Sequence, residues 1–304
     1  MTAFMKHLNF LLAIGVLAGT ATAQAQLSPS ANWAAHALND YQIFPNLTYV
    51  SASGVDVKLD IYQRRGATTA QPTVVFMHGG FWAAGSKEAA TMSLMPWFEM
   101  GWNVVNVEYR LARVALAPAA LEDCLCALRF LNNNAKTYFI DTSRIVVSGE
   151  SAGGHLALSL GMIPETAGFD RECAGAPLPK IAAVVNWYGV SDVNDVVDGP
   201  HRANLAMQWM GSQPNREELA RKVSPLTYVR AGLPPVLTIH GDADTTVPYS
   251  QAVRLHEALT KAGVTNQLLT IAGGKHGGFT PDERTRIFLT IREFLTKNGL
   301  PAGK

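Results

Sequence analysis

One serine stands between glycines at the point where an apolar stretch gives way to a helix-like stretch. Residues 149–153 read GESAG, and the three apolar residues directly before Ser148 are all β-branched. A G-x-S-x-G pentapeptide occurs by chance in many loops. Between a strand and a helix, however, it is typical of a sharp turn that presents a serine hydroxyl above a sheet. The stretch therefore predicts that Ser151 is a nucleophile.

A serine hydroxyl is a weak nucleophile at neutral pH, so it needs a base and an acid that orients the base. Three other predicted strands end in residues that fit these needs. They lead into HGGFW at 78–82, HGDAD at 240–244 and GGKHGG at 273–278. The chain order is thus serine, aspartate, histidine, which is the combination that nucleophilic acyl transfer requires.

The segment HGGFW, residues 78–82, is called the glycine loop below. A tetrahedral intermediate carries an oxyanion that needs preset N–H donors, and losing one donor raises the barrier by roughly 3–4 kcal/mol. We expect one donor at Ala152, at the start of the helix after Ser151, where the helix dipole also favours negative charge. Gly80 and Phe81 are the other candidate donors.

Several residues compete for the remaining roles. Asp242 and Asp244 both follow the same strand, and the residues alone leave the choice of acid open. Among the histidines, His276 is the candidate base because it follows the last predicted strand and glycines surround it. The other polar residues at these turns are given structural roles: His78 and the pair Tyr109-Arg110 as braces, His155 and His240 as packing residues, and Glu150 as a support for the turn.

Strand and helix patterns alternate along the chain, which predicts a mostly parallel sheet covered by helices on both faces. In such sheets, sites gather at the carboxyl ends of the strands. The predicted strands are 55–62, 72–80, 102–109, 144–149, 181–189, 234–241 and 266–274, and the predicted helices include 121–135, 250–263 and 284–299.

The chain resembles a known family. HGGFW, YRL, GESAGG, HGDADTTVP and KHGG occur in the order found in α/β-hydrolase esterases of the hormone-sensitive-lipase-like and BD-FAE-like feruloyl and acetylxylan groups. The resemblance covers roughly residues 45 to 300. It implies an α/β-hydrolase fold, with Ser151 as nucleophile, His276 as base and Asp244 as acid, and oxyanion donors at Gly80, Phe81 and Ala152. Asp242 then holds the turn.

One departure from the lipase-like group affects the expected substrate. That group has a third glycine where this chain has Phe81, followed by Trp82. A His-Gly-Gly-x-Trp loop is more similar to feruloyl and acetylxylan esterases and to arylformamidases. We therefore expect short acyl or aromatic esters, free or linked to polysaccharide. The alternatives are an arylformamidase-like amidase, a peptidase of the prolyl-oligopeptidase kind, and a non-catalytic binding scaffold.

Candidate substrate contacts are Trp82, Trp187 and Tyr188, because aromatic side chains at strand ends can stack on a sugar or a phenolic acid. For Trp187 and Tyr188 a core position is the alternative. Residues 191–230 are long for a simple crossover, and we expect them to form a small helical cap. No cofactor and no metal is expected, since no Cys/His pair has zinc-like spacing and no phosphate loop is present.

The N-terminus resembles a secretory signal peptide. Lys6 precedes an apolar run at 10–18, and small residues at 21, 23 and 25 offer two cleavage sites. The run is about half the length that a membrane span needs, so no stable anchor is expected. We therefore expect a signal peptide at 1–25 and a secreted or periplasmic α/β-hydrolase domain at 26–304.

Composition and cysteine content fit this expectation. Lys and Arg number 25 against 24 Asp and Glu, so nothing indicates a nucleic-acid partner, and 48% hydrophobic residues suit one large soluble domain. Three cysteines allow one disulfide in an oxidising compartment. Cys124 and Cys126 lie two apart on a predicted helix and point to different faces, so a bridge would include Cys173.

Overall fold

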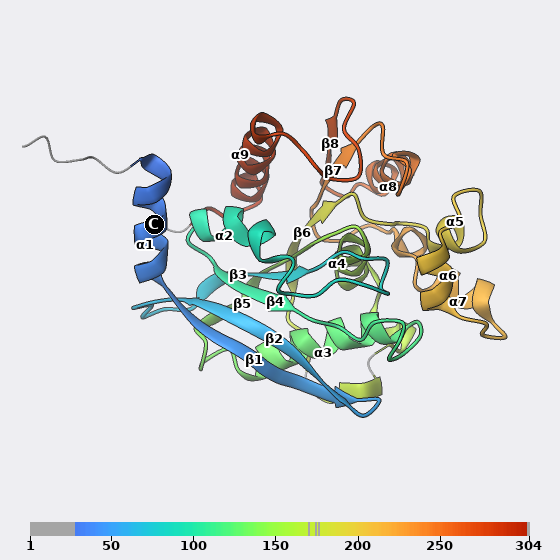
Figure 1. Cartoon of the computed structure of the whole chain (residues 1–304), viewed down its shortest axis with the longest axis horizontal. Helices are drawn as coiled ribbons and strands as arrows, with labels where there is room; N and C mark the ends of the chain where they lie inside the picture. The colour runs from blue at the N-terminus through green and yellow to red at the C-terminus, as the bar shows by residue number, and fades with distance from the viewer. Residues whose placement is uncertain (1–27, 170, 174, 176, 303–304) are drawn as a thin grey trace, which may run out of the picture.

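The computed structural model describes residues 28–169, 171–173, 175 and 177–302, which form an eight-stranded sheet with helices on both faces (Figure 1). The predicted signal peptide lies outside the described residues. In space the strands run β1-β2-β4-β3-β5-β6-β7-β8, and all neighbours from β4 to β8 are parallel. The mostly parallel sheet predicted from the sequence is confirmed. The strands are β1 (Tyr41–Ala52), β2 (Val55–Arg64), β3 (Gln71–Met77), β4 (Asn103–Val107), β5 (Ile140–Glu150), β6 (Ile181–Trp187), β7 (Val236–Gly241) and β8 (Asn266–Ile271).

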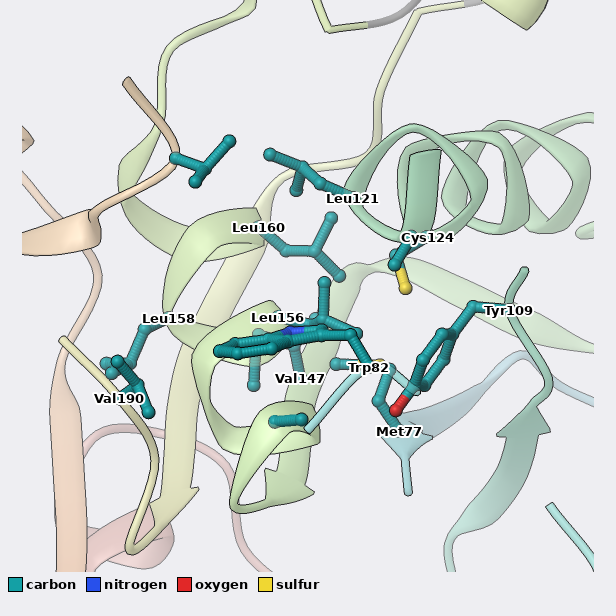
Figure 2. Close-up of a cluster of buried hydrophobic side chains, with 14 of the residues drawn as sticks. Met77, Trp82, Tyr109, Leu121, Cys124, Val147, Leu156, Leu158, Leu160 and Val190 are labelled. Carbon is teal, nitrogen blue, oxygen red and sulfur yellow. The ribbon is translucent and has the colours of Figure 1, made fainter. Parts of the chain in front are cut away.

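Alternate residues of the central strands feed two separate hydrophobic clusters. Val75 and Val147 belong to the cluster under α3, α4 and α8 (Figure 2), whereas Phe76 and Val146 belong to the cluster under α2 and α9. Because both faces are buried, the strands appear in the sequence as continuous apolar runs. These helices are α2 (Met95–Glu99), α3 (Ala119–Asn133), α4 (Ala152–Met162), α8 (Ser250–Lys261) and α9 (Pro281–Lys297), and the short 3-10 helices on the way are η1 (Thr91–Leu94), η2 (Glu165–Ala167) and η3 (Arg171–Cys173).

Two N-terminal elements were not predicted, the helix α1 (Pro29–Asp40) and the strand β1. No residue of α1 is buried, so it carries little of the apolar patterning that identifies a core helix. The strand β1 pairs antiparallel with β2 at the edge of the sheet and shifts register twice. It contains Pro45, and Asn46 has a positive φ of 56°. An edge strand tolerates such residues, but they hide its alternation.

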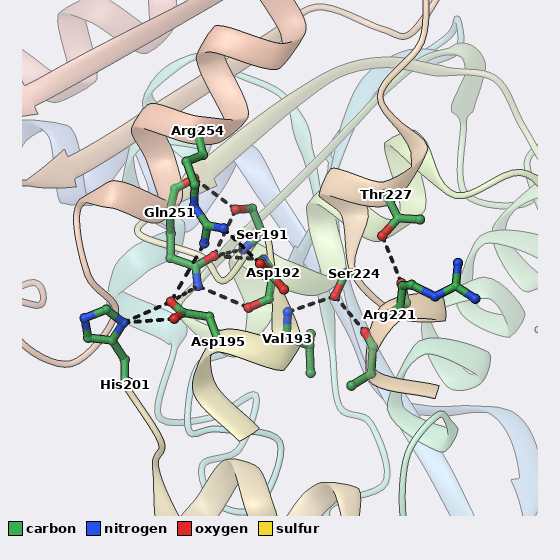
Figure 3. Close-up of polar contacts among 11 residues, drawn as sticks. Ser191, Asp192, Val193, Asp195, His201, Arg221, Ser224, Thr227, Gln251 and Arg254 are labelled. Atoms are coloured by element: carbon green, nitrogen blue, oxygen red, sulfur yellow. Dashed lines mark hydrogen bonds and ion pairs between the residues drawn. The ribbon is translucent and has the colours of Figure 1, made fainter. Parts of the chain in front are cut away.

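The predicted cap segment, residues 191–230, folds into short helices between β6 and β7. Its role as a cap over the active site stays a prediction. The buried side chain of Gln251 on α8 fixes its start (Figure 3). Its amide oxygen accepts from the Ser191 N–H and hydroxyl and from the Asp192 N–H, at 3.0, 2.9 and 2.8 Å. The segment contains α5 (Val193–Val197), α6 (Asn204–Met210), α7 (Arg216–Lys222) and η4 (Pro225–Tyr228).

One disulfide joins Cys126 on α3 to Cys173 on η3, and Cys124 remains a buried free thiol. From the sequence, a bridge between Cys124 and Cys126 was not expected, and either of them could pair with Cys173. The structure chooses Cys126, because Cys124 points from the same helix into the core beside Tyr109 (Figure 2). Within the described part of the chain, no helix is both long and apolar enough to cross a membrane.

Candidate active site

Ser151 lies at the junction of β5 and α4 in a strained backbone conformation, with φ 55° and ψ −116°. Its N–H donates to the carbonyl of Trp187 on the neighbouring strand at 2.9 Å. A Cβ atom at Gly153 would overlap the Met77 carbonyl oxygen at the end of β3, and one at Gly149 would meet Gly153 and Met77. The two glycines are therefore required because three backbone segments meet here without room for side chains.

Ser151, His276 and Asp244 form a continuous hydrogen-bonded chain, although they come from the ends of β5, β8 and β7. His276 Nε2 lies 2.9 Å from Ser151 Oγ, and His276 Nδ1 lies 2.7 Å from Asp244 Oδ2. Ser151 and Asp244 are buried, while the His276 side chain keeps 21% of its surface exposed. This arrangement can move a proton from the serine hydroxyl to the imidazole and hold the resulting positive charge beside a carboxylate.

The Asp244 carboxylate is held from several sides. Oδ1 accepts from the N–H groups of Thr246 and Val247 at 2.8 and 3.0 Å, and Oδ2 lies 3.3 Å from Nε2 of His240 as well as against His276. Burial would raise the pKa of this carboxyl, but the hydrogen bonds from His240 and His276 hold the pKa well below its ordinary value. The group is thus an anion that can orient His276.

Asp242 lies outside this chain of contacts. Its Oδ1 accepts from the N–H of Gly273 at 2.7 Å, which ties the turn after β7 to the turn after β8. Of the two aspartates, only Asp244 contacts His276, and it is the one that the family resemblance implied as the acid.

The glycine loop follows β3 and lies directly against Ser151. A Cβ on Gly79 would sit 3.3 Å from the Ser151 Cβ. Three consecutive residues have positive φ: 121° at Gly80, 50° at Phe81 and 57° at Trp82. For the two residues other than glycine this conformation costs about 1–2 kcal/mol each, so neighbouring contacts must hold it.

The three N–H groups predicted as oxyanion donors have no acceptor among the described residues. Among the described residues, the N–H groups of Gly80, Phe81 and Ala152 donate to no carbonyl or side chain. Two lie on the glycine loop, and the third opens α4, whose N-terminus favours negative charge. These are the donors that the sequence predicted for an oxyanion.

The other predicted bracing and packing residues occupy structural positions. His78 stacks on Tyr109 at 4.3 Å, and the Tyr109 hydroxyl donates to the His78 carbonyl at 2.9 Å, which supports the glycine loop from below. His240 is fully buried and its Nε2 lies 2.9 Å from the carbonyl of Val247 as well as near Asp244. Sequence reasoning treated His240 only as a core residue and missed its contact with the Asp244 carboxylate.

Arg110 and Glu150 complete the bracing around these turns. The Arg110 Nε donates to the Asp123 carboxylate at 2.9 and 3.0 Å, in a buried pair that ties the end of β4 to α3. The Glu150 carboxylate accepts from the Ser93 hydroxyl on η1 at 2.8 Å, and burial raises the pKa of Glu150. Glu150 thus supports the turn before Ser151 through its contact with η1.

The three predicted substrate contacts have different positions. Trp82 is fully buried under α6, and Trp187 is 3% exposed and packs on the opposite side of the sheet against Phe288. In contrast to the prediction, neither side chain reaches the surface beside Ser151, because the positive φ values turn Trp82 inward and the strand alternation turns Trp187 toward α9. The ring of Tyr188 does contact the site and lies edge-on to the His276 imidazole at 4.7 Å.

His155, on the first turn of α4, is fully buried and links this helix to two other segments. Its Nδ1 accepts from the Trp82 indole N–H at 3.1 Å, so its Nε2 carries the proton and donates to the Val223 carbonyl at 2.7 Å. Burial lowers the pKa of His155 to about 4. The imidazole is therefore neutral at neutral pH.

Across the described residues, no three His, Cys, Asp or Glu side chains converge in an arrangement that could hold a metal ion. The side chains of Ser151, His276 and Asp244 suit nucleophilic acyl transfer with proton transfer through an imidazole.

The sequence profile of the BD-FAE family matches residues 59–259, which is well over half of the chain. Among curated proteins, the chain is 28% identical to esterase LipC of Mycobacterium tuberculosis over 228 residues, covering 72% of this chain and 56% of LipC. The chain thus spans about half the length of the curated relatives it matches.

Solved structures match over more of their length. A truncated carbohydrate esterase from gut microbiota is 28% identical, with a TM-score of 0.73, over 85% of this chain and 97% of that one. Esterase 2 of Thermogutta terrifontis, solved with propionate bound, is 27% identical with a TM-score of 0.71, over 87% and 97%. These similarities bear out the α/β-hydrolase fold.

Acid should destabilise the protein through His155. The unfolded chain binds a proton on this histidine near pH 6.5, whereas the folded protein does so only near pH 4, so stability falls as the pH drops between these values. From pH 7 to pH 4.5 this group should remove about 2 kcal/mol of unfolding free energy. Urea unfolding at both pH values should show a smaller loss, by that amount, in His155→Asn than in the wild type.

The exposed His36 on α1 provides the control, and His36→Asn should keep the acid sensitivity of the wild type. Equal losses in the wild type and in His155→Asn would contradict the assignment of a buried neutral imidazole at this position.

Proposed function

The chain belongs to the BD-FAE family of α/β-hydrolase esterases, and from this we propose that it hydrolyses carboxylic esters through an acyl-enzyme on Ser151. The observation that carries the proposal is the hydrogen-bonded chain from Ser151 through His276 to Asp244, beside three N–H groups without a protein acceptor. A non-catalytic binding scaffold would have no need to keep this set of groups aligned.

In the proposed mechanism, Ser151 Oγ attacks the acyl carbon while His276 Nε2 takes its proton. The N–H groups of Gly80, Phe81 and Ala152 stabilise the oxyanion that forms on the carbonyl oxygen. The bond to the leaving alcohol then breaks as His276 returns the proton to the alkoxide oxygen. A water molecule, deprotonated by His276, then attacks the acyl carbon. The bond from this carbon to Ser151 Oγ breaks as His276 returns the proton to that oxygen, and the acid is released.

Asp244 keeps His276 in the tautomer that leaves Nε2 free to accept the serine proton, and it stabilises the imidazolium. Its low pKa supports this role, because the carboxylate stays ionised through the whole reaction. The Tyr188 ring lies against the His276 imidazole. It limits where the imidazole can move and forms one wall beside the reacting atoms.

The proposed substrates are short acyl or aromatic esters, including acetyl or feruloyl groups on polysaccharide. Support comes from the His-Gly-Gly-Phe-Trp sequence of the glycine loop and from the names of two similar structures, a carbohydrate esterase and an esterase solved with propionate. An arylformamidase-like amidase is the second candidate, because the same loop sequence is similar to that group.

The proposed site of action is outside the cytoplasm, after removal of residues 1–25. The disulfide between Cys126 and Cys173 supports this proposal, because such bonds persist in oxidising compartments and are rare in the cytosol. Neither cysteine has a role at the active site that would offer another explanation for the bond.

Export can be tested by mass spectrometry of the protein made in a bacterium with an intact secretory pathway. The periplasmic or secreted protein should begin at Gln24 or Gln26, and its unreduced digest should contain a peptide bridged between Cys126 and Cys173. A full-length protein that remains in the cytoplasm with reduced cysteines would contradict the proposal.

Ser151→Ala should lower kcat for ester hydrolysis by between about a thousand-fold and about a million-fold. The wild type should be assayed on p-nitrophenyl esters of increasing chain length, methyl ferulate, acetylated xylan and N-formylkynurenine. We expect the highest kcat/KM on short acyl or feruloyl esters. A preference for N-formylkynurenine would replace the ester with an amide substrate, and full activity of Ser151→Ala would refute the mechanism.

The two aspartates give a matched pair of variants. Asp244→Asn removes the charge that orients His276 and should lower kcat about ten-thousand-fold, as loss of the tautomer-setting acid does in other serine hydrolases. Asp242→Asn only weakens the turn bond to Gly273 and should stay within a few-fold of the wild type. The reverse order of the two effects would assign the acid to Asp242.

A further inference from the structure

The buried contact between Trp82 and His155 joins the two parts of the site that carry unpaired N–H groups. Trp82 follows Phe81 directly on the glycine loop, and His155 lies three residues after Ala152 on α4. The Trp82 indole N–H donates to His155 Nδ1 at 3.1 Å, and the two rings meet edge to face at 4.9 Å. A single side-chain hydrogen bond thus ties the loop that carries Phe81 to the helix that carries Ala152.

The glycine loop is held by backbone hydrogen bonds and by the side chain of Trp82. The Gly80 carbonyl accepts from the N–H groups of Ala83 and Ala84 at 3.1 and 3.0 Å, and the Trp82 carbonyl accepts from Ala112 at 2.9 Å. These bonds close the turn that spans Phe81 and Trp82, and the fully buried Trp82 side chain adds a second constraint on their positive φ values. The direction of the Phe81 N–H depends on the peptide plane between Gly80 and Phe81, which lies within this turn.

The segment 191–230 supplies the other contacts to this pair. The Trp209 ring on α6 stacks on the Trp82 ring, with centroids 4.1 Å apart and an angle of 20° between the planes. The carbonyl of Val223, at the end of α7, accepts the His155 Nε2 proton at 2.7 Å. The side chains of Trp82, Trp209 and His155 are fully buried. Figure 2 shows the Trp82 indole lying beside Leu156 of α4.

The segment itself is fixed to the core away from this contact. Gln251 on α8 is fully buried, and its Nε2 donates to the Asp192 carbonyl and to the Asp195 carboxylate at 3.1 and 2.8 Å (Figure 3). The hydroxyl of Ser224, just after α7, accepts from the Val193 N–H at 2.8 Å. The segment that carries Trp209 and Val223 is therefore held by polar contacts that do not involve the glycine loop.

We propose that Trp82, His155 and Trp209 are positioning residues that set the direction of the Phe81 N–H relative to that of Ala152, so that residues 191–230 control the strength of oxyanion stabilisation. The inference rests on the proposed function, since it requires an oxyanion at this place. It assigns to Trp82 a role behind the reacting atoms instead of the substrate contact that the sequence suggested.

The neutral imidazole is suited to this role. Only one tautomer both accepts from the Trp82 N–H and donates to the Val223 carbonyl, so the ring has one preferred orientation. Of the other polar groups against it, Ser159 Oγ lies 3.4 Å from Nε2. No charged side chain among the described residues makes a hydrogen bond or ion pair with the ring.

The test uses Trp82→Phe, which keeps an aromatic ring under Trp209 but removes the N–H, and His155→Leu, which removes the acceptor. Two properties should be measured: kcat and KM for p-nitrophenyl butyrate, and inhibition by a trifluoromethyl ketone, whose adduct with serine carries an oxyanion. We expect kcat to fall about tenfold to hundredfold with KM changed less than about threefold. The ketone should bind more weakly by the same factor as kcat/KM falls.

Two further variants separate positioning from packing. His155→Asn keeps an acceptor near the place of Nδ1 and should recover a part of kcat relative to His155→Leu. Trp97→Phe is the matched control, because Trp97 is a fully buried tryptophan in the other hydrophobic cluster and its indole N–H has no acceptor among the described residues. It should lower thermal stability without changing kcat or the ketone affinity.

The outcomes distinguish this inference from the proposed function. A folded Trp82→Phe with the kcat and ketone affinity of the wild type would overturn the inference, and so would equal effects of Trp82→Phe and Trp97→Phe on kcat. If the wild type hydrolyses esters and Ser151→Ala does not, the proposed function stands in either case. If Ser151→Ala keeps its activity, the proposed function fails whatever the Trp82 variants do.

Discussion

The close approach of three backbone segments around Met77 is the constraint on which the rest of the site depends. The Met77 carbonyl at the end of β3 lies where a side chain on Gly153 would be, and Gly149 is packed against the same group. This packing fixes the turn between β5 and α4, and with it the strained conformation of Ser151. Because the glycine loop begins directly after Met77, the same contact also determines where the loop passes the serine.

The charge distribution follows from this geometry. The ends of β7 and β8 bring Asp244 and His276 to the strained serine, and Asp244 receives hydrogen bonds from two backbone N–H groups and contacts from two histidines. A carboxylate satisfied in this way stays ionised although it is buried. Among the described residues the N–H groups of Phe81 and Ala152 have no acceptor, so they can favour negative charge on a carbonyl oxygen, while Asp244 favours positive charge on the imidazole.

The helical segment between β6 and β7 contacts Trp82 of the glycine loop and His155 of α4. Trp209 covers Trp82, the Val223 carbonyl binds His155, and Gln251 holds the start of the segment on α8. A change in this segment would therefore reach the N–H groups beside Ser151 through packed rings and one hydrogen bond. The effect would pass through direct contacts between Trp209, Trp82 and His155, and it requires no motion of the sheet.

Local patterning in the sequence was enough to predict the sheet class, the turn at Ser151 and the histidine that lies beside this serine. Continuous apolar runs mark strands buried on both faces, and a G-x-S-x-G between strand and helix specifies the turn. Residue patterning left four features open that the packing of separate elements settles: which aspartate contacts His276 (Asp244, as the family resemblance implied), where Trp82 and Trp187 point, which cysteine pairs with Cys173, and that β1 joins the edge of the sheet. These outcomes depend on how separate elements pack, and neighbours in the sequence such as Asp242 and Asp244 differ only in the direction in which the folded turn holds their side chains.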